Sequence, residues 1–305
     1  MPQVMADTPL KIGMIGLDTS HAEVFTGMLN DPNSKAHVPG GRVVAAFPGG
    51  SPDMDISRNR VEGFTKTLRE KYSVEMKDTP EAVAEAVDLV MILSVDGRVH
   101  RQQFERTVKL KKPTFIDKPF AVTVEDAESM LRTARAERVP LMSCSSVRYS
   151  ENVVAALGGK REQVLGCDAH GPLSETPTQP GVFFYGVHTV DLIVSVLGHG
   201  CREVRAAHYN ACDVAALSWP DGRVATARLM KEPHGNFGIT LHRKGGAQFV
   251  DASAAKRPAY ASMLEAVLRS LPQGKSDVAE DEMLDTVRIC AAINQARETG
   301  QAVRV

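Results

Sequence analysis

Residues 11–21 read KIGMIGLDTSH, and this stretch decides the fold of the N-terminal part of the chain. Its apolar first half is typical of a buried strand. Ser20 and Glu23 then have the spacing of a capping box, in which two side chains bond N–H groups that a first helical turn leaves unpaired. A strand that runs directly into a capped helix is the opening unit of an α/β domain, and such turns hold ligands.

The same alternation of short apolar runs and longer segments of helical period continues to about Ser146. It predicts a parallel sheet built from βαβ units. Thr79 before Pro80, and Thr123 with Asp126, mark two further helix starts. The expected strands are Lys11–Leu17, Arg42–Phe47, Asp88–Ser94, Pro113–Asp117 and Val139–Ser143.

After Ser146 the pattern changes to β segments separated by turns, with Asp221-Gly222 and Gly245-Gly246 as expected hairpin turns. It predicts an open, mostly antiparallel sheet with helices on one face, an α+β arrangement. The expected strands are Ala206–Leu217, Arg223–Met230, Asn236–His242 and Ala247–Val250, and the expected helices are Val187–Leu197, Tyr260–Leu271 and Asp281–Thr299.

The length of 305 residues exceeds what one compact core usually reaches, so two domains are expected. We place them at residues 10–146, a Rossmann-type parallel α/β domain, and 147–305, an α+β domain that binds substrate or mediates oligomerisation. The last helix is expected to be able to pack back on the first domain.

The composition is that of an ordinary globular protein, with 43% hydrophobic and 24% charged residues. The net charge of -1 gives no field that would attract a polyanion, which argues against nucleic acid as a partner. Five cysteines without a C-x-x-C pair are expected to be free thiols. Residues 1–10 do not read as a signal peptide and no stretch is apolar enough to span a membrane, so we expect no membrane association and a cytoplasmic location.

The turn after the first strand is where a dinucleotide fingerprint, G-x-G-x-x-G, is expected. Gly16 takes its first place, but Asp18 and His21 replace the second and third glycines. A carboxylate about 4 Å from a phosphate oxygen would cost roughly 1 to 4 kcal/mol. The alternative is structural: Gly13 and Gly16 only allow close packing of strand and helix, Asp18 acts as a local cap, and His21 serves the fold.

A second determinant is expected at the end of the second strand, where an acid usually binds the adenosine ribose. Phe47 stands there instead. The loop that follows carries Ser51, Arg58 and Arg60, which could receive a 2′-phosphate or could be plain surface residues. The loop slightly favours NADP over NAD. The candidate cofactor-binding residues are Gly13, Gly16, Asp18, Thr19, Ser20, His21, Ser51, Ser94, His100 and Asp117.

Three further motifs resemble the glucose-fructose oxidoreductase / inositol dehydrogenase family, Gfo/Idh/MocA. Residues 94–100, SVDGRVH, lie where that family has T-P-N-x-x-H; residues 117–121, DKPFA, look like its Glu-Lys-Pro motif; and residues 185–191, YGVHTVD, are similar to its G-x-H-x-x-D segment. The resemblance spans nearly the whole chain. It implies a Rossmann domain followed by an open sheet, NAD(P) as cofactor, a sugar, cyclitol or polyol as substrate, and a homo-dimer or homo-tetramer. Phe184 replaces an acid that the family usually carries.

Hydride transfer from a carbinol requires a base for the hydroxyl proton, and His188 is the candidate; the alternative is a buried histidine bonded to a backbone carbonyl. Lys118 would bind the same oxygen and stabilise its developing charge. Asp191, three residues after His188, would orient the imidazole, bind a substrate hydroxyl or cap a helix. Tyr185 would stack on a sugar or belong to the core. His100 would cap the helix that follows it.

Other readings remain open. His170, His188, Asp191 and His208 have suitable ligand chemistry for a metal, but their spacing fits no close motif, so no metal is expected. The replacements Asp18, Phe47 and Phe184 favour a second function, a Rossmann-fold binding or regulatory protein without catalysis. A lyase or hydrolase that uses His188 without redox chemistry is a third.

Overall fold

The structure, a computed structural model, describes residues 8–231 and 235–305. The chain divides into two compact units. Unit 1 contains the chain up to Lys118, with Glu128–Ser143 and Met263–Asp277, and unit 2 contains Pro119–Ala127, Cys144–Ser262 and Val278–Val305. These bounds differ from a single division at 146/147, because Leu268 and its neighbours pack where the second strand begins, against Gly41. The expectation about a leader falls on residues 1–7, which lie outside the described residues.

The sheet of unit 1 has the strand order β3-β2-β1-β4-β5-β6, with every pair parallel. Its order reverses between β1 and β4, which makes the carboxyl ends of these strands the expected ligand site. The predicted parallel sheet is confirmed, and β3 is the one strand too short to leave a sequence pattern. The strands are β1 Leu10–Ile15, β2 Gly41–Phe47, β3 Glu75–Met76, β4 Leu89–Ile92, β5 Thr114–Ile116 and β6 Leu141–Ser143.

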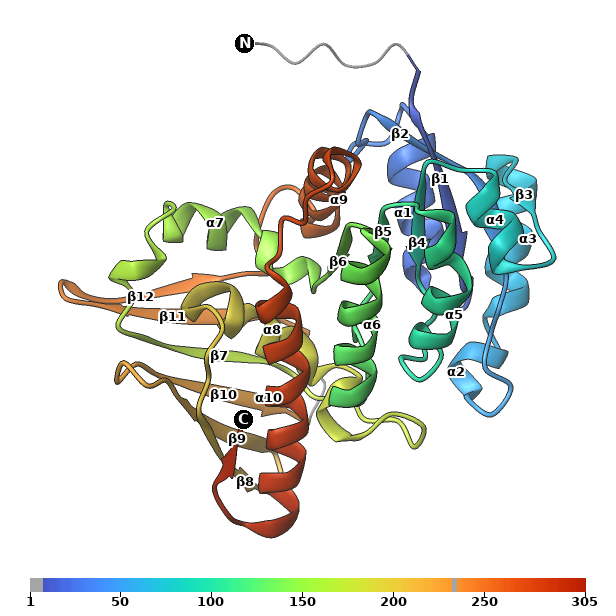
Figure 1. The fold of residues 1–305 in the computed structure, drawn as a ribbon. Coiled ribbons are helices and arrows are strands. Elements are labelled where there is room, and N and C mark those ends of the chain that lie inside the picture. The colour runs from blue at the N-terminus through green and yellow to red at the C-terminus, as the bar shows by residue number, and fades with distance from the viewer. Residues whose placement is uncertain (1–7, 232–234) are drawn as a thin grey trace. The chain divides into compact units, whose positions relative to one another are not determined.

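The helices of unit 1 pack in pairs, α1 with α3 and α4 with α5 (Figure 1). Gly13 allows α4 to approach β1, since a Cβ there would meet Val83 at 2.4 Å. The caps at Thr79 and Thr123 are present, each accepting a backbone N–H at 3.1 Å. The helices are α1 Ser20–Asn30, α2 Asp55–Arg58, α3 Val61–Tyr72, α4 Pro80–Glu85, α5 His100–Thr107 and, shared with unit 2, α6 Val124–Glu137 and α9 Ala259–Ser270.

The sheet of unit 2 has the order β12-β11-β7-β10-β9-β8-β13. Only the β7–β10 pair is parallel among the described pairs, so the mostly antiparallel sheet is confirmed. One expected strand, Ala206–Leu217, is wrong, because the chain reverses at Tyr209, whose N–H donates to Cys212, and forms two strands. The strands are β7 Gly166–Pro172, β8 Glu203–His208, β9 Cys212–Ser218, β10 Val224–Met230, β11 Gly238–Arg243, β12 Gly246–Asp251 and β13 Val303–Arg304.

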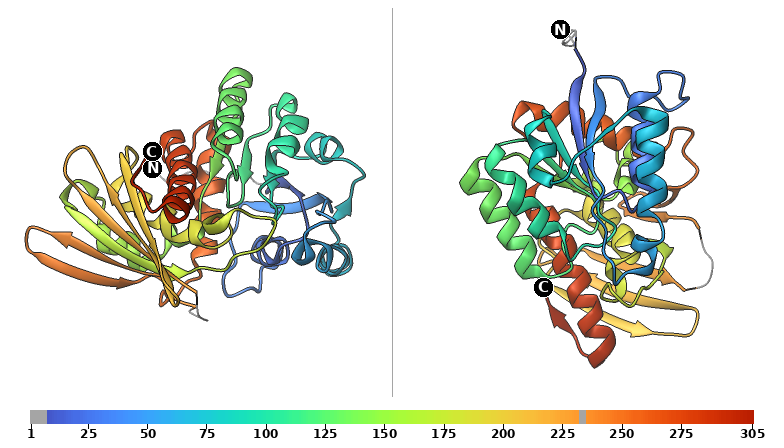
Figure 2. Two further views of the ribbon diagram at one scale, coloured as in Figure 1. Left: turned by 90° about the horizontal axis from the view of Figure 1, so that it is seen from below. Right: turned by 90° about the vertical axis from the view of Figure 1, so that its right-hand side faces the viewer.

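Two helices of unit 2 lie against its sheet (Figure 2). Helix α8, Gly186–Leu197, packs on β7 and β10, and α10, Glu280–Thr299, packs on α8 and β8. The last long helix thus belongs to unit 2, whereas most of α9, which was expected beside it, belongs to unit 1. Helix α7, Glu151–Leu157, contacts β12. All residues of α8 except Ser195 are buried, which makes His188 and Asp191 polar side chains within an apolar helix.

Two global features complete the fold. All five cysteines are buried free thiols, as expected. No helix among the described residues has the length and apolar character required to cross a membrane.

Candidate active site

The turn after β1 places Asp18 inside unit 1. Its side chain is fully buried, and its two oxygens accept hydrogen bonds from Ser57 Oγ at 2.6 Å and from the N–H of Val95 at 2.9 Å. Burial raises the pKa of Asp18, although these two bonds oppose the shift. The carboxylate therefore serves as an internal acceptor. The cap of α1 is Thr19, whose Oγ1 accepts the N–H of His21, and not the expected Ser20, which is the first helical residue.

Gly16 has the conformation that the first fingerprint glycine requires. Its φ is +89°, and a Cβ there would lie 2.2 Å from Ser94 Oγ. The Ser94 hydroxyl accepts a hydrogen bond from Gln103 Nε2 at 2.8 Å. His100 is fully buried and donates from Nε2 to the Ser94 carbonyl at 2.8 Å. The expectation that His100 caps α5 is wrong, because His100 is itself the first residue of that helix and its ring bonds back to the turn after β4.

The loop after β2 folds back on the first turn. The N–H of Ser51 donates to Ser57 Oγ at 2.7 Å, and Ser51 is buried. Arg58 pairs with Asp55 and also donates to the Pro52 carbonyl. Arg60 is exposed at the start of α3. Of the two cations considered for a 2′-phosphate, one is therefore already paired within the loop.

Asp117 and Lys118 follow β5. Asp117 Oδ2 lies 2.5 Å from His21 Nδ1, and both side chains are buried. Burial disfavours the Asp117 carboxylate, but the charge and hydrogen bond of His21 and the charge of Lys118 outweigh it and hold its pKa below the ordinary value. Burial lowers the pKa of Lys118, against the opposing effect of Asp117. The lysine that follows β5 is therefore easier to deprotonate than a solvated one.

His188 lies in the first turn of α8 in unit 2. Its Nδ1 is 2.7 Å from Ser145 Oγ, which also accepts the N–H of Val147 at 3.1 Å. The rings of Tyr185 and Phe237 lie against the imidazole, with centroids at 5.5 Å and 5.4 Å. Tyr185 is 37% exposed, so its ring is not part of a closed core. The imidazole is thus fixed at one nitrogen and packs against two aromatic rings.

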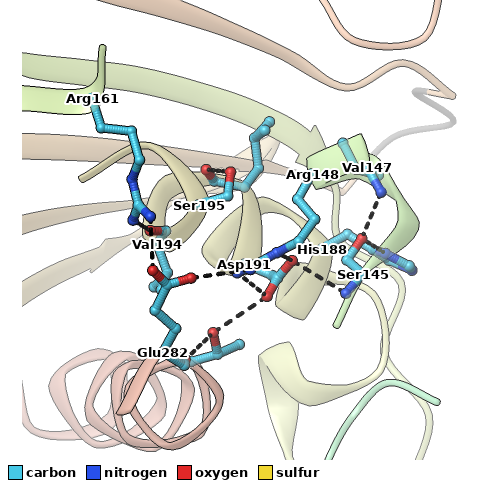
Figure 3. Close-up of polar contacts among 11 residues, drawn as sticks. Ser145, Val147, Arg148, Arg161, His188, Asp191, Val194, Ser195 and Glu282 are labelled. Carbon is cyan, nitrogen blue, oxygen red and sulfur yellow. Dashed lines mark hydrogen bonds and ion pairs between the residues drawn. The ribbon is translucent and has the colours of Figure 1, made fainter. Parts of the chain in front are cut away.

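Asp191 bonds the segment that carries Ser145, the partner of His188, and not His188 itself (Figure 3). It accepts the N–H of Ser145 at 3.1 Å and two bonds from Arg148, each at 3.0 Å. Arg148 also donates to Glu282 at 3.0 Å, and Glu282 pairs with Arg161 at 2.8 Å. Asp191 lies within α8, so it is not a helix cap.

The electrostatics of this network are balanced. Burial raises the pKa of Asp191 although Arg148 opposes the shift, and the two carboxylates raise the pKa of Arg148 against the effect of burial. Two guanidinium groups face two carboxylates. Removal of Arg148, which bonds both carboxylates, would leave Asp191 buried without its cation.

The residues considered as metal ligands have other partners. His170 stacks on Phe249, and His208 pairs with the buried Asp213 at 3.0 Å. Within residues 8–231 and 235–305, no cluster of three or more His, Cys, Asp or Glu side chains is arranged to hold a metal ion.

Comparison with protein families adds a match for the first unit. Residues 10–144 match the model of the oxidoreductase family Gfo/Idh/MocA, NAD-binding Rossmann fold. These residues contain all six strands of unit 1 and the Asp117-Lys118-Pro119 motif. Residues 10–144 therefore carry the NAD-binding Rossmann domain of the Gfo/Idh/MocA family. A comparison with curated protein sequences gives no significant match.

The chain is also similar to solved structures over nearly its whole length. The chain is similar to myo-inositol 2-dehydrogenase from Lactobacillus plantarum, with TM-score 0.78, 15% identity and coverage of 98% of this chain and 100% of that one. It is similar to myo-inositol dehydrogenase from Lactobacillus casei in complex with NAD(H) and myo-inositol, with TM-score 0.77, 14% identity and coverage of 98% and 97%. An oxidoreductase from Agrobacterium radiobacter in complex with NAD+, L-tartaric acid and magnesium gives TM-score 0.71 and 18% identity over 97% and 98%. At these identities the similarity shows the fold, across both units.

The first turn of this Gfo/Idh/MocA domain fits the pyrophosphate of a dinucleotide. Gly16 keeps the tight turn, the Asp18 carboxylate is bonded to Ser57 and Val95, and Ser20 is exposed on the first turn of α1. The positive end of an 11-residue helix favours an anion there. At the adenosine end Phe47 offers no acceptor for ribose hydroxyls, so that half of the site departs from the family pattern.

Sequence reasoning missed several residues that bond Asp18 in unit 1 or His188 and Asp191 in unit 2. Ser57 carries no motif and lies 39 residues from Asp18. Ser145, Arg148 and Glu282 were also missed, although one signal was available: an arginine that ends the small polar run SCSSVR at residues 143–148, shortly after a strand, is a candidate for a buried charge. The partner Glu282 lies 134 residues away, beyond the reach of any local pattern.

Proposed function

We propose that this chain is an NAD(P)-dependent oxidoreductase that transfers a hydride to or from a carbon bearing a hydroxyl group, with a sugar, cyclitol or related polyol as substrate. The observation that supports this most is the fixed imidazole of His188, bonded at Nδ1 to Ser145 Oγ. If Nδ1–H donates to Ser145, Nε2 carries the lone pair that accepts a proton. A general base for the alcohol proton requires this arrangement.

In the proposed reaction the bound nicotinamide supplies the hydride acceptor or donor. His188 takes the hydroxyl proton during oxidation and returns it during reduction. Lys118 stabilises developing negative charge, and its lowered pKa makes the ammonium a better proton donor near neutral pH. Tyr185, exposed beside His188, offers a ring for an apolar sugar face. Asp191 contributes by holding Ser145 and not by touching substrate.

Cofactor binding is the first test. Calorimetric titration with NAD+, NADH, NADP+ and NADPH is expected to show binding of at least one pair. Both pairs are included because Phe47 offers no acid to the adenosine ribose and Arg58 is already paired with Asp55. Absence of binding at millimolar concentration would overturn the proposal. Sedimentation of the same sample tests the expected homo-dimer or homo-tetramer.

Turnover is the second test, with myo-inositol, scyllo-inositol and simple aldoses as substrates. We expect Lys118→Met and His188→Asn each to lower kcat/KM by about 10²–10⁴-fold, the usual effect of losing an acid–base group or a charge stabiliser. The matched controls are Lys109→Met and His199→Asn, which change exposed side chains. Equal activity of the site variants and their controls would exclude the assigned roles.

A second candidate, a binding or regulatory protein without catalysis, is favoured by one observation. Asp18 and Phe47 replace two cofactor determinants, and Asp18 has become a structural acceptor. Binding of cofactor or polyol without turnover under all the conditions above would select this function. Product formation without any added cofactor would instead indicate a lyase or hydrolase.

A further inference from the structure

Two departures from the family motifs meet in unit 1. His21 stands in the third glycine position of the fingerprint, and Asp117 replaces the glutamate before Lys118. The structure brings these two side chains together, with His21 Nδ1 at 2.5 Å from Asp117 Oδ2. Both are buried, at 7% and 4% exposure. An aspartate is one methylene shorter than a glutamate, and an imidazole is the group that reaches it here.

The contact spans a third strand. In the sheet order, β4 lies between β1, whose turn leads to His21, and β5, whose end carries Asp117. The backbone of Asp117 is itself fixed, since its N–H donates to the Ile92 carbonyl at the end of β4 at 2.8 Å. The Asp117 side chain is therefore bonded by His21, which follows β1, across the point where the strand order reverses between β1 and β4.

The imidazole is also held in place on its own helix. The His21 ring stacks on Phe25 one turn later, with centroids 5.0 Å apart and planes 14° apart. The N–H of His21 donates to the Thr19 cap. A ring fixed at both its face and its backbone loses little further entropy when it binds a carboxylate. This makes His21 a rigid support and not a mobile surface histidine.

We propose that His21 is a positioning residue for Lys118: its imidazole fixes the carboxylate of Asp117, whose negative charge acts on the ammonium group of the next residue. The two departures from the family motifs then form one compensated pair. The consequence for turnover rests on the proposed function, whereas the control of Lys118 by the pair does not. Lys118 reactivity is therefore the decisive measurement.

The experiment measures acetylation of Lys118 by trace acetic anhydride across a pH series, quantified by peptide mass spectrometry, in the full chain without cofactor. His21→Leu keeps the bulk and removes the hydrogen bond, and we expect the acetylation rate of Lys118 to change by about tenfold. His21→Asn places an amide nitrogen near the position of Nδ1 and is expected to remain close to the wild type. His37→Leu is the matched control, since the His37 ring bonds the backbone carbonyl of Met28 in the same unit.

The compensation itself is tested by His21→Gly and Asp117→Glu, which restore the family residues singly and together. Each single change is expected to alter Lys118 reactivity, and the double variant is expected to return towards the wild type. Should a glycine variant fail to fold, the comparison of His21→Leu with His21→Asn decides. Equal Lys118 reactivity in the wild type and His21→Leu, or strictly additive single effects, would overturn the proposal. Coupled reactivity in a protein without turnover would leave it standing while the proposed function fails.

Discussion

The carboxylate of Asp18 and the hydroxyl of Ser57 lie 2.6 Å apart, although 39 residues separate them in the sequence. Ser57 Oγ accepts the N–H of Ser51, and the second carboxylate oxygen accepts the N–H of Val95. One side chain thereby connects the segments that follow β1, β2 and β4. Asp18 stands where a glycine usually lets a ligand approach the backbone, and here its carboxylate bonds other segments of the protein.

The stability effect of Asp18 is expected to depend on pH. Burial raises its pKa, so the folded state binds this proton more tightly than the unfolded chain does. The corresponding stabilisation is fully present below the unfolded pKa of about 3.9 and is lost as pH rises through the higher folded pKa. The free energy of unfolding of Asp18→Asn is therefore expected to increase relative to that of the wild type as pH rises above about 4. Urea unfolding at a series of pH values measures it.

Ser57→Ala supplies the control for this series. It removes the hydroxyl that bonds Asp18, without removing the acid, and should destabilise by about 1 kcal/mol. A difference between Asp18→Asn and the wild type that stays constant or falls with rising pH would contradict the role given to Asp18.

Gly16 and Gly63 should respond oppositely to alanine. At Gly16, the φ of +89° and a Cβ only 2.5 Å from the Ser94 nitrogen predict a loss of about 2 to 4 kcal/mol. At Gly63, within α3, nothing lies within 4 Å of the added Cβ, and a gain of about 0.5 to 1 kcal/mol is expected. Urea unfolding of both variants checks the pair, and a stable Gly16→Ala protein would show that the turn after β1 can rearrange.

Ser145→Ala removes the group that fixes Nδ1 of His188. We expect kcat to fall by about 10 to 100-fold, because an imidazole with the wrong tautomer or orientation is a poor base. Ser195→Ala is the control, since its hydroxyl donates to the Leu192 carbonyl on the same helix. Steady-state kinetics separates them, and similar kcat values for the two variants would remove Ser145 from the site.

Arg148→Met should destabilise the protein by about 3 to 5 kcal/mol, because Asp191 and Glu282 would be left buried with one fewer cation. Adding Asp191→Leu is expected to recover part of this loss. Arg161→Met, at a side chain that is 41% exposed, should cost no more than about 1 kcal/mol. Urea unfolding provides the comparison, and equal losses at Arg148 and Arg161 would argue against a buried network.

The sequence predicts the elements of this protein well where each element is long and locally patterned. The apolar runs of β1, β2 and β4 and the helical periods of α8 and α10 were all placed within a few residues. Short or interrupted elements were not: β3 has two residues, and β7, GCDAHGP, mixes glycine, proline and charge. The hairpin of β8 and β9 was read as one strand because its reversal at Tyr209 carries no glycine or proline.

Individual residues of the candidate site could be predicted from the sequence, but the contacts between them could not. Sequence motifs drew attention to Asp18, His21, Asp117 and His188, but their partners come from elsewhere in the chain. Asp18 looked like a repulsive charge towards phosphate, and the structure instead gives its carboxylate two internal donors. Hydrogen bonds over 39 to 134 residues follow from tertiary packing, which no local spacing encodes.

Each unit is built from separate parts of the chain: residues 119–127 belong to unit 2, and residues 263–277 belong to unit 1. A ribosome must therefore synthesise every strand of the second sheet except β13 before the first unit has all its parts. The Rossmann unit cannot complete its folding early during translation, as an uninterrupted N-terminal domain would. For the same reason, a gene fragment that ends at residue 144 would encode an incomplete domain, with the surface beneath Leu268 uncovered.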